Sequence, residues 1–457
     1  MRLFTKLNNV TQSTFARAVA VLMGGTIFGQ ALAILALPLL TRLYTPEDFS
    51  VLAVYSALLG VLSIVSTLRL DVAIPMPKKS EDAANLLVLA VFFVLLTSSL
   101  VMALIWVIPY DVIAKSPISV LSAYLWMIPL GILLAGLYNA LQFWAIRNKS
   151  FMLISHTRIT QSVMAVSVQI GFGFWGLMPL GLLLGYVCSN GGGVLGLSKD
   201  VWQKDKKSFN AVSFASMKKT LYEYRRFPQY STFEAFANSA AIQIPIIFIA
   251  ALAIGPDAGY LMLAMRVMQA PMTLIGSSIA QVYLARAPEE YRKGNLQLFT
   301  VDVFGGLLKT GIGPIIFAGI VAPYIFPIVF GDTWSRAGIL ITWMTPWFIF
   351  NFLASPISMA IQVLGHQYLA LLLQIFGFFL RLGFVIAASI YVKGSISEAY
   401  AVSGAVFYLV YLIIILKLTH IGIAVLFNEI KNSIYYILAW SAFGGVVALL
   451  LTYFLRL

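Results

Sequence analysis

Charged residues are scarce in this chain of 457 residues: they make up 10% of the sequence, whereas hydrophobic residues make up 60%. Soluble proteins carry about 25% charged residues, and a soluble chain of this length would form several domains that each need a polar coat. Thirty Lys and Arg residues and seventeen Asp and Glu residues could not supply that coat. With a mean hydropathy of +0.91, the composition excludes an ordinary soluble protein and predicts a polytopic membrane protein.

Cysteine and histidine are also rare, which excludes several kinds of chemistry. Cys188 is the single cysteine, so the chain can form neither a disulfide framework nor a multi-thiolate metal site. The three histidines are far apart and no Walker A string is present, so we expect no metal, no cofactor and no ATP hydrolysis. Two glycine strings, 171–176 and 191–196, match the dinucleotide fingerprint, but no strand precedes either of them. We interpret them as places where helices bend or approach closely.

Long apolar runs dominate the sequence. Thirteen stretches of about 20 residues are apolar enough to cross a bilayer as helices, and they lack the alternation of a membrane barrel, so we predict an all-α fold. The first run is too long for a signal-peptide core and is expected to remain as a span. The predicted spans are 18–41, 49–68, 84–108, 118–143, 157–177, 179–198, 229–254, 258–284, 298–322, 337–363, 368–392, 397–417 and 433–455.

The basic residues predict the orientation of these spans. If the N-terminus is cytoplasmic, twenty-two of the thirty Lys and Arg residues lie on the cytoplasmic side and only five on the outer side. This bias follows the positive-inside rule. Because most charges sit in short segments between apolar runs, the net charge of +13 indicates membrane topology and no nucleic-acid partner.

One hydrophilic segment, 199–226, interrupts the apolar runs and carries eight basic and three acidic residues. We interpret it as a cytoplasmic linker held near anionic headgroups, with a regulatory role as the alternative. The strings TPEDFSVLA at 45–53 and GPDAGYLMLA at 255–264 form a faint repeat at equivalent places in the two halves. We predict two six-helix lobes and one extra C-terminal helix. In this count the extra helix would place the C-terminus outside, and a count that differs by one span would place it inside. The predicted boundaries are 1–198 and 229–417 for the lobes, 199–228 for the linker and 418–457 for the extra helix.

Polar residues recur at helical spacing inside the predicted spans. Hydrogen bonding between helices is one explanation, but a charge near mid-membrane costs about 2.5–3.5 kcal/mol, and Arg266, Lys309 and Arg381 would all lie at such depth. We therefore expect a watery, polar interior. The helical stripes are Arg158, Gln161 and Gln169 in span five; Arg266, Gln269, Thr273, Ser277 and Gln281 in span eight; and Asn351, Ser355, Ser358 and Gln362 in span ten.

The sign of the interior charge favours an anionic substrate, because the deep basic residues outnumber the acids and supply several donors to phosphate. Asp302 could carry a coupling ion or could neutralise Lys309, which lies two turns farther along the same span. Glu234 could also carry a coupling ion, or it could be an ordinary residue of the membrane interface. The predicted substrate-binding residues are Arg69, Arg158, Arg266, Gln269, Lys309, Asn351, Gln362 and Arg381, and the candidates for H⁺ or Na⁺ coupling are Glu234 and Asp302.

Three separated segments, 38–77, 224–287 and 330–365, resemble the polysaccharide biosynthesis or oligosaccharide flippase family (Wzx-type) of the multidrug/oligosaccharidyl-lipid/polysaccharide (MOP) exporter superfamily. Arg266 lies within the family-like block AMRVMQAP. The resemblance implies two six-helix bundles around a central cavity that works by alternating access. It also implies a location in the bacterial inner membrane and a basic lumen, which would correspond here to Arg69, Arg266, Lys309 and Arg381.

The resemblance and the charge argument together predict a flippase and not an enzyme. Its substrate would be a polyprenyl-diphosphate-linked oligosaccharide, a precursor of lipopolysaccharide O-antigen, capsule or exopolysaccharide, with membrane lipids and other polysaccharide assembly proteins as further partners. A cation-coupled multidrug exporter on the same scaffold is the alternative, and it would need acidic residues in the cavity. A glycosyl polymerase or transferase would need a sizeable outer loop or an acidic catalytic motif, whereas the predicted outer loops are short.

Overall fold

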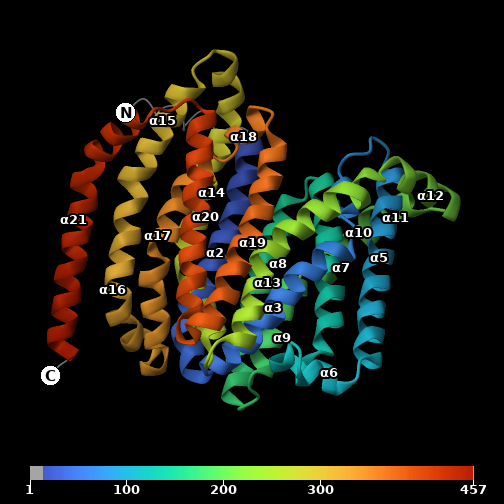
Figure 1. The fold of residues 1–457 in the computed structure, drawn as a ribbon. Coiled ribbons are helices and arrows are strands. Elements are labelled where there is room, and N and C mark those ends of the chain that lie inside the picture. The colour runs from blue at the N-terminus through green and yellow to red at the C-terminus, as the bar shows by residue number, and fades with distance from the viewer. Residues whose placement is uncertain (1–13, 211, 456–457) are drawn as a thin grey trace. The chain divides into compact units, whose positions relative to one another are not determined.

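The computed structural model describes residues 14–210 and 212–455, and every regular element within these ranges is a helix or a helical turn (Figure 1). The all-α prediction is therefore confirmed. The described chain divides into two compact units: unit 1 comprises 14–44 and 54–243, and unit 2 comprises 45–53 and 244–455. Two long helices, α3 and α13, contribute residues to both units.

Unit 1 is built from the N-terminal helices. Its elements are α2 (Thr14–Leu43), most of α3 (Pro46–Ser66), α4 (Leu70–Ala73), α5 (Ser80–Val107), α6 (Tyr110–Ala114), the 3-10 turn η1 (Ser119–Tyr124), α7 (Met127–Arg147), α8 (Phe151–Phe174), α9 (Leu180–Gly191), α10 (Val194–Lys204), α11 (Lys206–Phe209), α12 (Phe214–Glu223), the π turn η2 (Phe227–Ser231) and the first part of α13 (Thr232–Leu252).

Unit 2 contains the remaining helices and the first turns of α3. Its elements are the end of α13, α14 (Asp257–Arg292), α15 (Leu296–Leu307), the π turn η3 (Leu308–Ile312), α16 (Gly313–Phe330), the 3-10 turn η4 (Asp332–Trp334), α17 (Ser335–Ile357), α18 (Ala360–Val363), α19 (Gln367–Tyr391), the 3-10 turn η5 (Lys393–Ser395), α20 (Ile396–Leu418) and α21 (Ile423–Leu455).

Eleven helices within the described residues are long and apolar enough to cross a membrane. The two predicted spans that are not among them, 157–177 and 258–284, form α8 and α14, of 24 and 36 residues. The fourth predicted span begins at Met127 and not at 118, because the residues after Pro117 close tight i→i+3 hydrogen bonds, such as Leu121 N to Ile118 O at 2.9 Å. The chain is a multi-pass membrane protein.

Small residues set the contact between α2 and α8 in unit 1. Gly25 and Gly29 lie one turn apart on α2, and a Cβ atom at either would overlap Ser155 or Ser162 of α8. Small residues at this spacing let two helix backbones approach closely within a membrane, where packing and hydrogen bonds replace the hydrophobic effect. The α2–α8 interface therefore depends on the absence of side chains at two positions.

Polar contacts organise the predicted cytoplasmic end of unit 1. The guanidinium of Arg147 donates to four carbonyl oxygens within residues 74–78, the closest at 2.5 Å. Trp144 Nε1 donates to Asp205 Oδ2 at 2.8 Å. The segment predicted as a linker forms the end of α10 together with α11 and α12, and Ser216 Oγ of α12 donates to Asn85 Oδ1 of α5 at 2.9 Å (Figure 1). Residues 199–210 and 212–223 are thus packed against the ends of α5 and α7.

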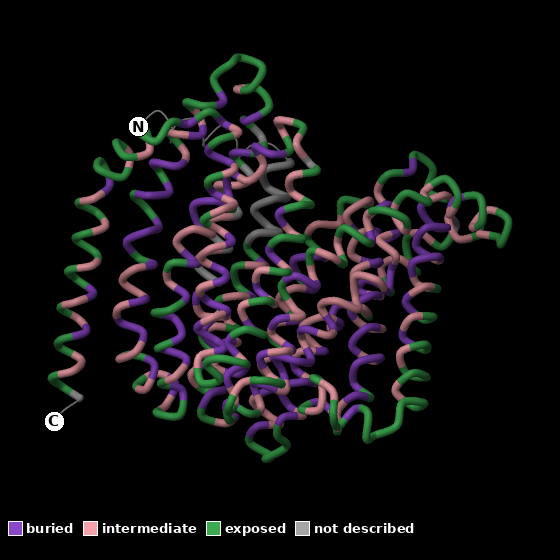
Figure 2. Tube along the Cα trace, in the orientation of Figure 1, coloured by how far each residue is buried: buried purple, intermediate pink, exposed green. Residues whose placement is uncertain are grey.

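In unit 2, α16, α17 and α20 pack side by side, and α21 lies against α16 (Figure 1). A Cβ atom at Gly313 would overlap Trp440 of α21, and the rings of Phe317 and Phe443 stack with centroids 5.3 Å apart. The remaining surface of α21 is largely exposed (Figure 2). The predicted extra C-terminal helix is therefore a packed part of unit 2 along one face.

The two strings of the sequence repeat meet within unit 2. The amide of Gly259 donates to Ser50 Oγ at 2.9 Å, and a Cβ atom at Gly259 would overlap the carbonyl oxygen of Pro46. Phe49 also packs edge-on against Trp334, with ring centroids 4.8 Å apart. The repeated turns are thus neighbours in space, and a glycine permits their close contact.

We predict that Gly25→Val destabilises unit 1 by about 1–3 kcal/mol, because the new side chain is forced against the α8 backbone, where Ser155 O lies 2.9 Å from the ideal Cβ position. Gly24→Val is the matched control, since nothing lies within 4 Å of a Cβ atom there. Unfolding of the two purified variants in detergent, monitored by circular dichroism, tests this. Equal stability of both variants would contradict the proposed close contact.

Candidate binding cavity

A cavity of about 360 Å³ with a mixed polar and apolar lining lies within unit 2, between α14, α17 and α20. Its polar lining comes from Gln269 of α14, Asn351 and Ser355 of α17, and Tyr408 of α20. The rest of the lining is Met272, Gly276, Ala280, Phe352 and Pro356. Amide and hydroxyl groups of this kind donate and accept hydrogen bonds, so the cavity suits a ligand rich in hydroxyl groups.

The spacing of α17 explains why two of its polar residues reach this cavity. Asn351 and Ser355 are four residues apart and therefore lie on one face of the helix. The helix ends at Ile357, and the next residue, Ser358, donates from its hydroxyl to the Ser355 carbonyl at 2.7 Å. Ser358 also shares a hydrogen bond with Tyr411 of α20, so the end of the stripe joins α17 to α20.

Arg381 of α19 is a buried positive charge that contacts α20, one of the helices that line the cavity. The residue is 2% exposed, and its guanidinium carbon lies 4.4 Å from the centroid of the Phe407 ring. An aromatic face stabilises a desolvated cation. Arg381 thus packs against α20 at Phe407, the residue that precedes Tyr408 of the cavity lining.

Lys309 and Asp302 do not form the ion pair that the sequence left open. Both side chains are exposed, and none of the five ion pairs formed within the described residues joins them. The two residues are seven positions apart, which corresponds to a rise of about 10.5 Å along an α-helix. Even on one helix face, their charged groups are therefore too far apart for an ion pair, and Lys309 itself lies in the π turn η3.

The other predicted residues of unit 2 lie along the same helices. Arg266 is half-buried one turn before Gln269 on α14, and it has interaction partners. Gln362 is exposed on the short helix α18 and is not part of the cavity lining. The side chains of Thr273, Ser277 and Gln281 lie outside those that the structure describes. The structure thus places Gln269 and Asn351 together in the cavity lining, and Gln362 apart from it.

The predicted residues of unit 1 lie in other surroundings. Arg158 donates from Nη1 to Thr26 Oγ1 within the α2–α8 interface. Arg69 stands before α4 in a left-handed backbone conformation, with φ at 57°. Glu234 is exposed in the first turn of α13.

Arg69 has a buried acid as its neighbour in the connection between α3 and α5. Asp71 Oδ1 accepts a hydrogen bond from Thr67 Oγ1 at 2.9 Å. Burial raises the pKa of the Asp71 carboxyl group, while the Thr67 hydrogen bond and the charge of Arg69 oppose this rise. Arg69, which the sequence predicted as a substrate-binding residue, thus stands beside a buried acid.

An ion cluster that the sequence did not predict joins three helix starts of unit 2. Arg336 of α17 lies 2.5 Å from Glu398 of α20 and 3.4 Å from Asp257 of α14. Both acids are largely buried, and each stands in the first turn of its helix, where the positive end of the helix dipole favours a carboxylate. In the sequence these acids were scattered, so no local spacing could connect them.

A family comparison covers most of the chain. The family described as polysaccharide biosynthesis protein matches residues 39–338. The chain belongs to this family. The resemblance found in the sequence is therefore confirmed, whereas a search of curated proteins found no significant match.

Solved structures show that this member of the polysaccharide biosynthesis family has the MOP superfamily fold. The inward closed conformation of the lipid II flippase MurJ aligns with a TM-score of 0.63 at 13% identity, over 95% of this chain and 98% of that chain. The inward-facing conformation of a multidrug resistance MATE family transporter aligns with a TM-score of 0.61 at 14% identity, over 87% and 96%. A MOP superfamily transporter from Pyrococcus furiosus, described as having a binding pocket of reverse polarity, aligns with a TM-score of 0.54 at 15% identity, over 88% and 95%.

We predict that Arg336→Ala lowers the free energy of unfolding by about 1–3 kcal/mol, because it leaves two buried carboxylates without their shared donor. Lys393→Ala is the control, since it removes an exposed positive charge close to the cluster, next to Gly394, whose carbonyl oxygen accepts from Arg336. Adding Glu398→Gln to Arg336→Ala should recover part of the loss by removing one of the two acids. Thermal unfolding in detergent measures all three variants, and an unchanged Arg336→Ala protein would refute the cluster's role.

Proposed function

We propose that this protein is a flippase that moves polyprenyl-diphosphate-linked oligosaccharide units across the bacterial inner membrane by alternating access. The observation that carries the proposal is the cavity between α14, α17 and α20, whose polar lining consists of amide and hydroxyl groups. Membership of the polysaccharide biosynthesis family supports a saccharide as the transported group. The fold shared with a lipid II flippase supports a lipid-linked form of it.

The lining suits a saccharide because sugar hydroxyls lose their water partners in a membrane and need replacements. Gln269 and Asn351 each offer both donors and an acceptor, and Ser355 and Tyr408 add hydroxyl groups. A volume of about 360 Å³ accommodates part of an oligosaccharide. Arg381 would favour the diphosphate through its long-range charge, because phosphate retains negative charge and Arg381 is buried where screening is weak.

The alternative is a cation-coupled multidrug exporter on the same scaffold, since MATE transporters share the fold. A cationic drug would be recognised best by a carboxylate in the cavity. No acidic side chain is present among the residues that line the cavity in the described part of unit 2, and the buried charge over the neighbouring Phe407 ring is the positive charge of Arg381. These features favour an anionic substrate over a cationic drug.

We further propose that Glu234 or Asp302 couples transport to a H⁺ or Na⁺ gradient, because both carboxylates are exposed on the protein and a carboxylate can bind either ion. The orientation with a cytoplasmic N-terminus rests on the distribution of Lys and Arg. In that orientation, transport carries the saccharide from the cytoplasmic leaflet to the outer leaflet. Other polysaccharide assembly proteins would then receive the product.

We predict that Gln269→Ala and Asn351→Ala each reduce flipping about tenfold, because each removes hydrogen bonds worth roughly 1–1.5 kcal/mol to the saccharide. The assay uses proteoliposomes with a fluorescent lipid-linked oligosaccharide and follows its exposure to a membrane-impermeant quencher. Ser389→Ala is the control, since this half-buried serine of α19 lies outside the cavity lining and donates to the Ile386 carbonyl of its own helix. Wild-type proteoliposomes that export drugs but do not flip the oligosaccharide would favour the exporter.

We predict that Arg381→Gln weakens binding of a diphosphate-linked saccharide several-fold, whereas binding of the same free, uncharged saccharide changes little, because only the charge on the ligand differs. Arg381→Lys should restore part of the affinity, since it keeps a positive charge beside Phe407. Isothermal titration with the purified, folded variants measures both ligands. Equal losses for the charged and uncharged ligands would show that Arg381 acts only through packing.

A further inference from the structure

The cavity of unit 2 has an apolar wall on α17, next to its polar groups. Phe352 and Pro356 are four residues apart and therefore lie on one face of the helix, beside the face that carries Asn351 and Ser355. Phe352 is buried, with 3% of its surface exposed. Its ring therefore forms a boundary of the cavity and is not a surface that a ligand would cover.

The Phe352 ring lies directly against Gly311, which belongs to the π turn η3. A Cβ atom at Gly311 would overlap the Cδ1, Cε1 and Cζ atoms of the ring, the farthest of the three at 2.7 Å. Because real Cβ atoms do not approach other atoms this closely, only a glycine leaves room for the ring in this position. π turns are rare, and many of them lie at functional sites.

The cavity is the free space next to this ring. The residues around Phe352 on α17 are packed, since Phe348, Leu353 and Ala354 are at most 5% exposed, and protein interiors leave few voids. A side chain at position 311 would displace the ring, and the cavity of about 360 Å³ is the space that the ring can enter. Gly311 thus determines how far the ring extends into the cavity.

The wall on α14 is formed in part by small residues. Gly276 and Ala280 are four residues apart in the lining, and no described atom lies within 4 Å of a Cβ atom at Gly276. The cavity is therefore open at Gly276 and bounded at Phe352. Its width depends on the position of the Phe352 ring.

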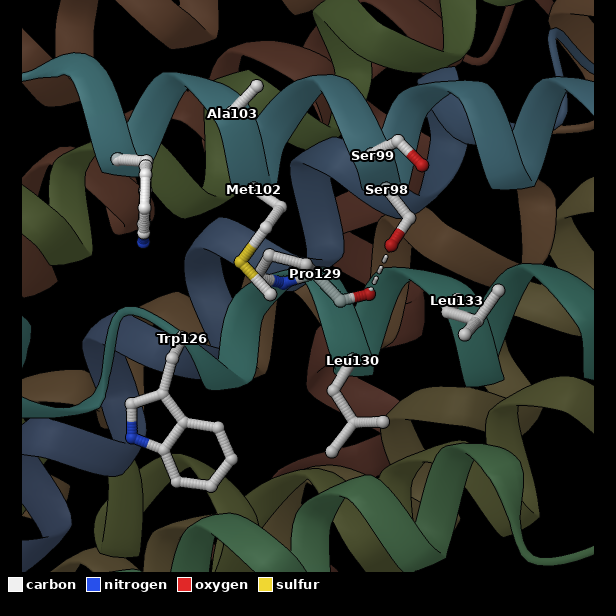
Figure 3. A pocket seen from close by; sticks show the side chains of 9 residues that line it. Ser98, Ser99, Met102, Ala103, Trp126, Pro129, Leu130 and Leu133 are labelled. Carbon is white, nitrogen blue, oxygen red and sulfur yellow. Dashed lines mark hydrogen bonds between the residues drawn. The ribbon is translucent and has the colours of Figure 1, made fainter.

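A larger hollow, of about 740 Å³, lies between α5 and α7 in unit 1, but its lining offers little to a saccharide (Figure 3). The described residues that line it include no charged side chain. The Ser98 hydroxyl already donates to the Pro129 carbonyl at 2.8 Å, as the dashed line in Figure 3 shows. Selection of the saccharide therefore belongs to the cavity of unit 2.

We propose that Gly311 and Phe352 set the width of this cavity, and thereby the bulk of the saccharide that it accepts. Phe352 is the wall, and Gly311 is a positioning residue that acts through Phe352. This inference rests on the proposed flippase function and adds to it a determinant of specificity. The cavity would distinguish a compact saccharide from a branched one that is carried by the same lipid diphosphate.

The first experiment moves the wall. Proteoliposomes are supplied with undecaprenyl diphosphate that carries either a disaccharide or a branched tetrasaccharide of N-acetylglucosamine. Gly311→Ala should slow flipping of the tetrasaccharide about tenfold, as expected when one methyl group overpacks the site, and should slow flipping of the disaccharide much less. Gly306→Ala is the matched control, since no described atom lies within 4 Å of a Cβ atom there.

The second experiment separates a moved wall from general damage. Phe352→Val removes all three ring atoms that the new methyl group meets, so adding it to Gly311→Ala should restore flipping of the tetrasaccharide. Phe352→Val alone should favour the tetrasaccharide over the disaccharide, and it carries the test if Gly311→Ala does not fold. Phe348→Val is the control, because it changes a buried phenylalanine of α17 outside the lining. Equal losses for both saccharides, or no recovery in the double variant, would overturn the proposal.

A labelling experiment measures the width without transport. Asn351→Cys combined with Cys188→Ser places the single thiol of the chain in the lining, and a small and a bulky methanethiosulfonate reagent are compared in detergent. Gly311→Ala should slow labelling by the bulky reagent several-fold and labelling by the small reagent little, whereas Gly306→Ala should change neither rate. An unchanged ratio of the two rates in Gly311→Ala would contradict the proposal.

These experiments separate failure of this inference from failure of the proposed function. If wild-type protein flips both saccharides but Gly311→Ala changes neither the preference between them nor the labelling, the function stands and the inference is wrong. If wild-type protein flips neither saccharide, the proposed function is wrong. The labelling result then still decides whether Gly311 and Phe352 set the width of the cavity.

Discussion

A lipid bilayer supplies no water to a polar side chain, so a membrane protein must provide the partner itself or open a wet space beside it. The basic residues of the described helices show several ways of meeting this constraint. Arg381 lies over the Phe407 ring, Arg158 donates to Thr26, and Arg336 joins two helix-start acids. The cavity of unit 2 adds another solution, because its amide and hydroxyl groups are available to a ligand.

The spacing of polar residues could predict part of this cavity because a helix has a fixed period. Residues four apart share a face, and on that ground the stripes of spans eight and ten predicted that Gln269 and Asn351 belong to one polar interior. The structure places both in one lining. Spacing could not identify Tyr408, because one tyrosine carries no distinct signal in a chain with 14% aromatic residues. Its role depends on α20 packing beside α17.

Axial distances and long-range contacts account for most of what the sequence could not provide. Asp302 and Lys309 are two helical turns apart, about 10.5 Å along the axis, so their predicted alignment on one face does not produce an ion pair. The cluster of Asp257, Arg336 and Glu398 joins three helix starts that are far apart in the chain. The all-α fold was predictable because each span is encoded locally by its own apolar run.

Arg381 lies over the Phe407 ring and is not part of the cavity lining. This placement affects how easily a transporter could release its substrate. A guanidinium in direct contact with a diphosphate forms a strong bidentate pair, and in a site from which water is excluded such a pair would dissociate slowly. Neutral amide and hydroxyl groups bind each sugar hydroxyl with a net energy of about 1 kcal/mol, so their contacts can be exchanged one at a time. In the proposed flippase, the charge of Arg381, which lies over the Phe407 ring, would attract an anion, while direct contacts with the neutral cavity lining would stay weak. A flippase needs this combination, because a substrate that binds too tightly is not released on the other side of the membrane.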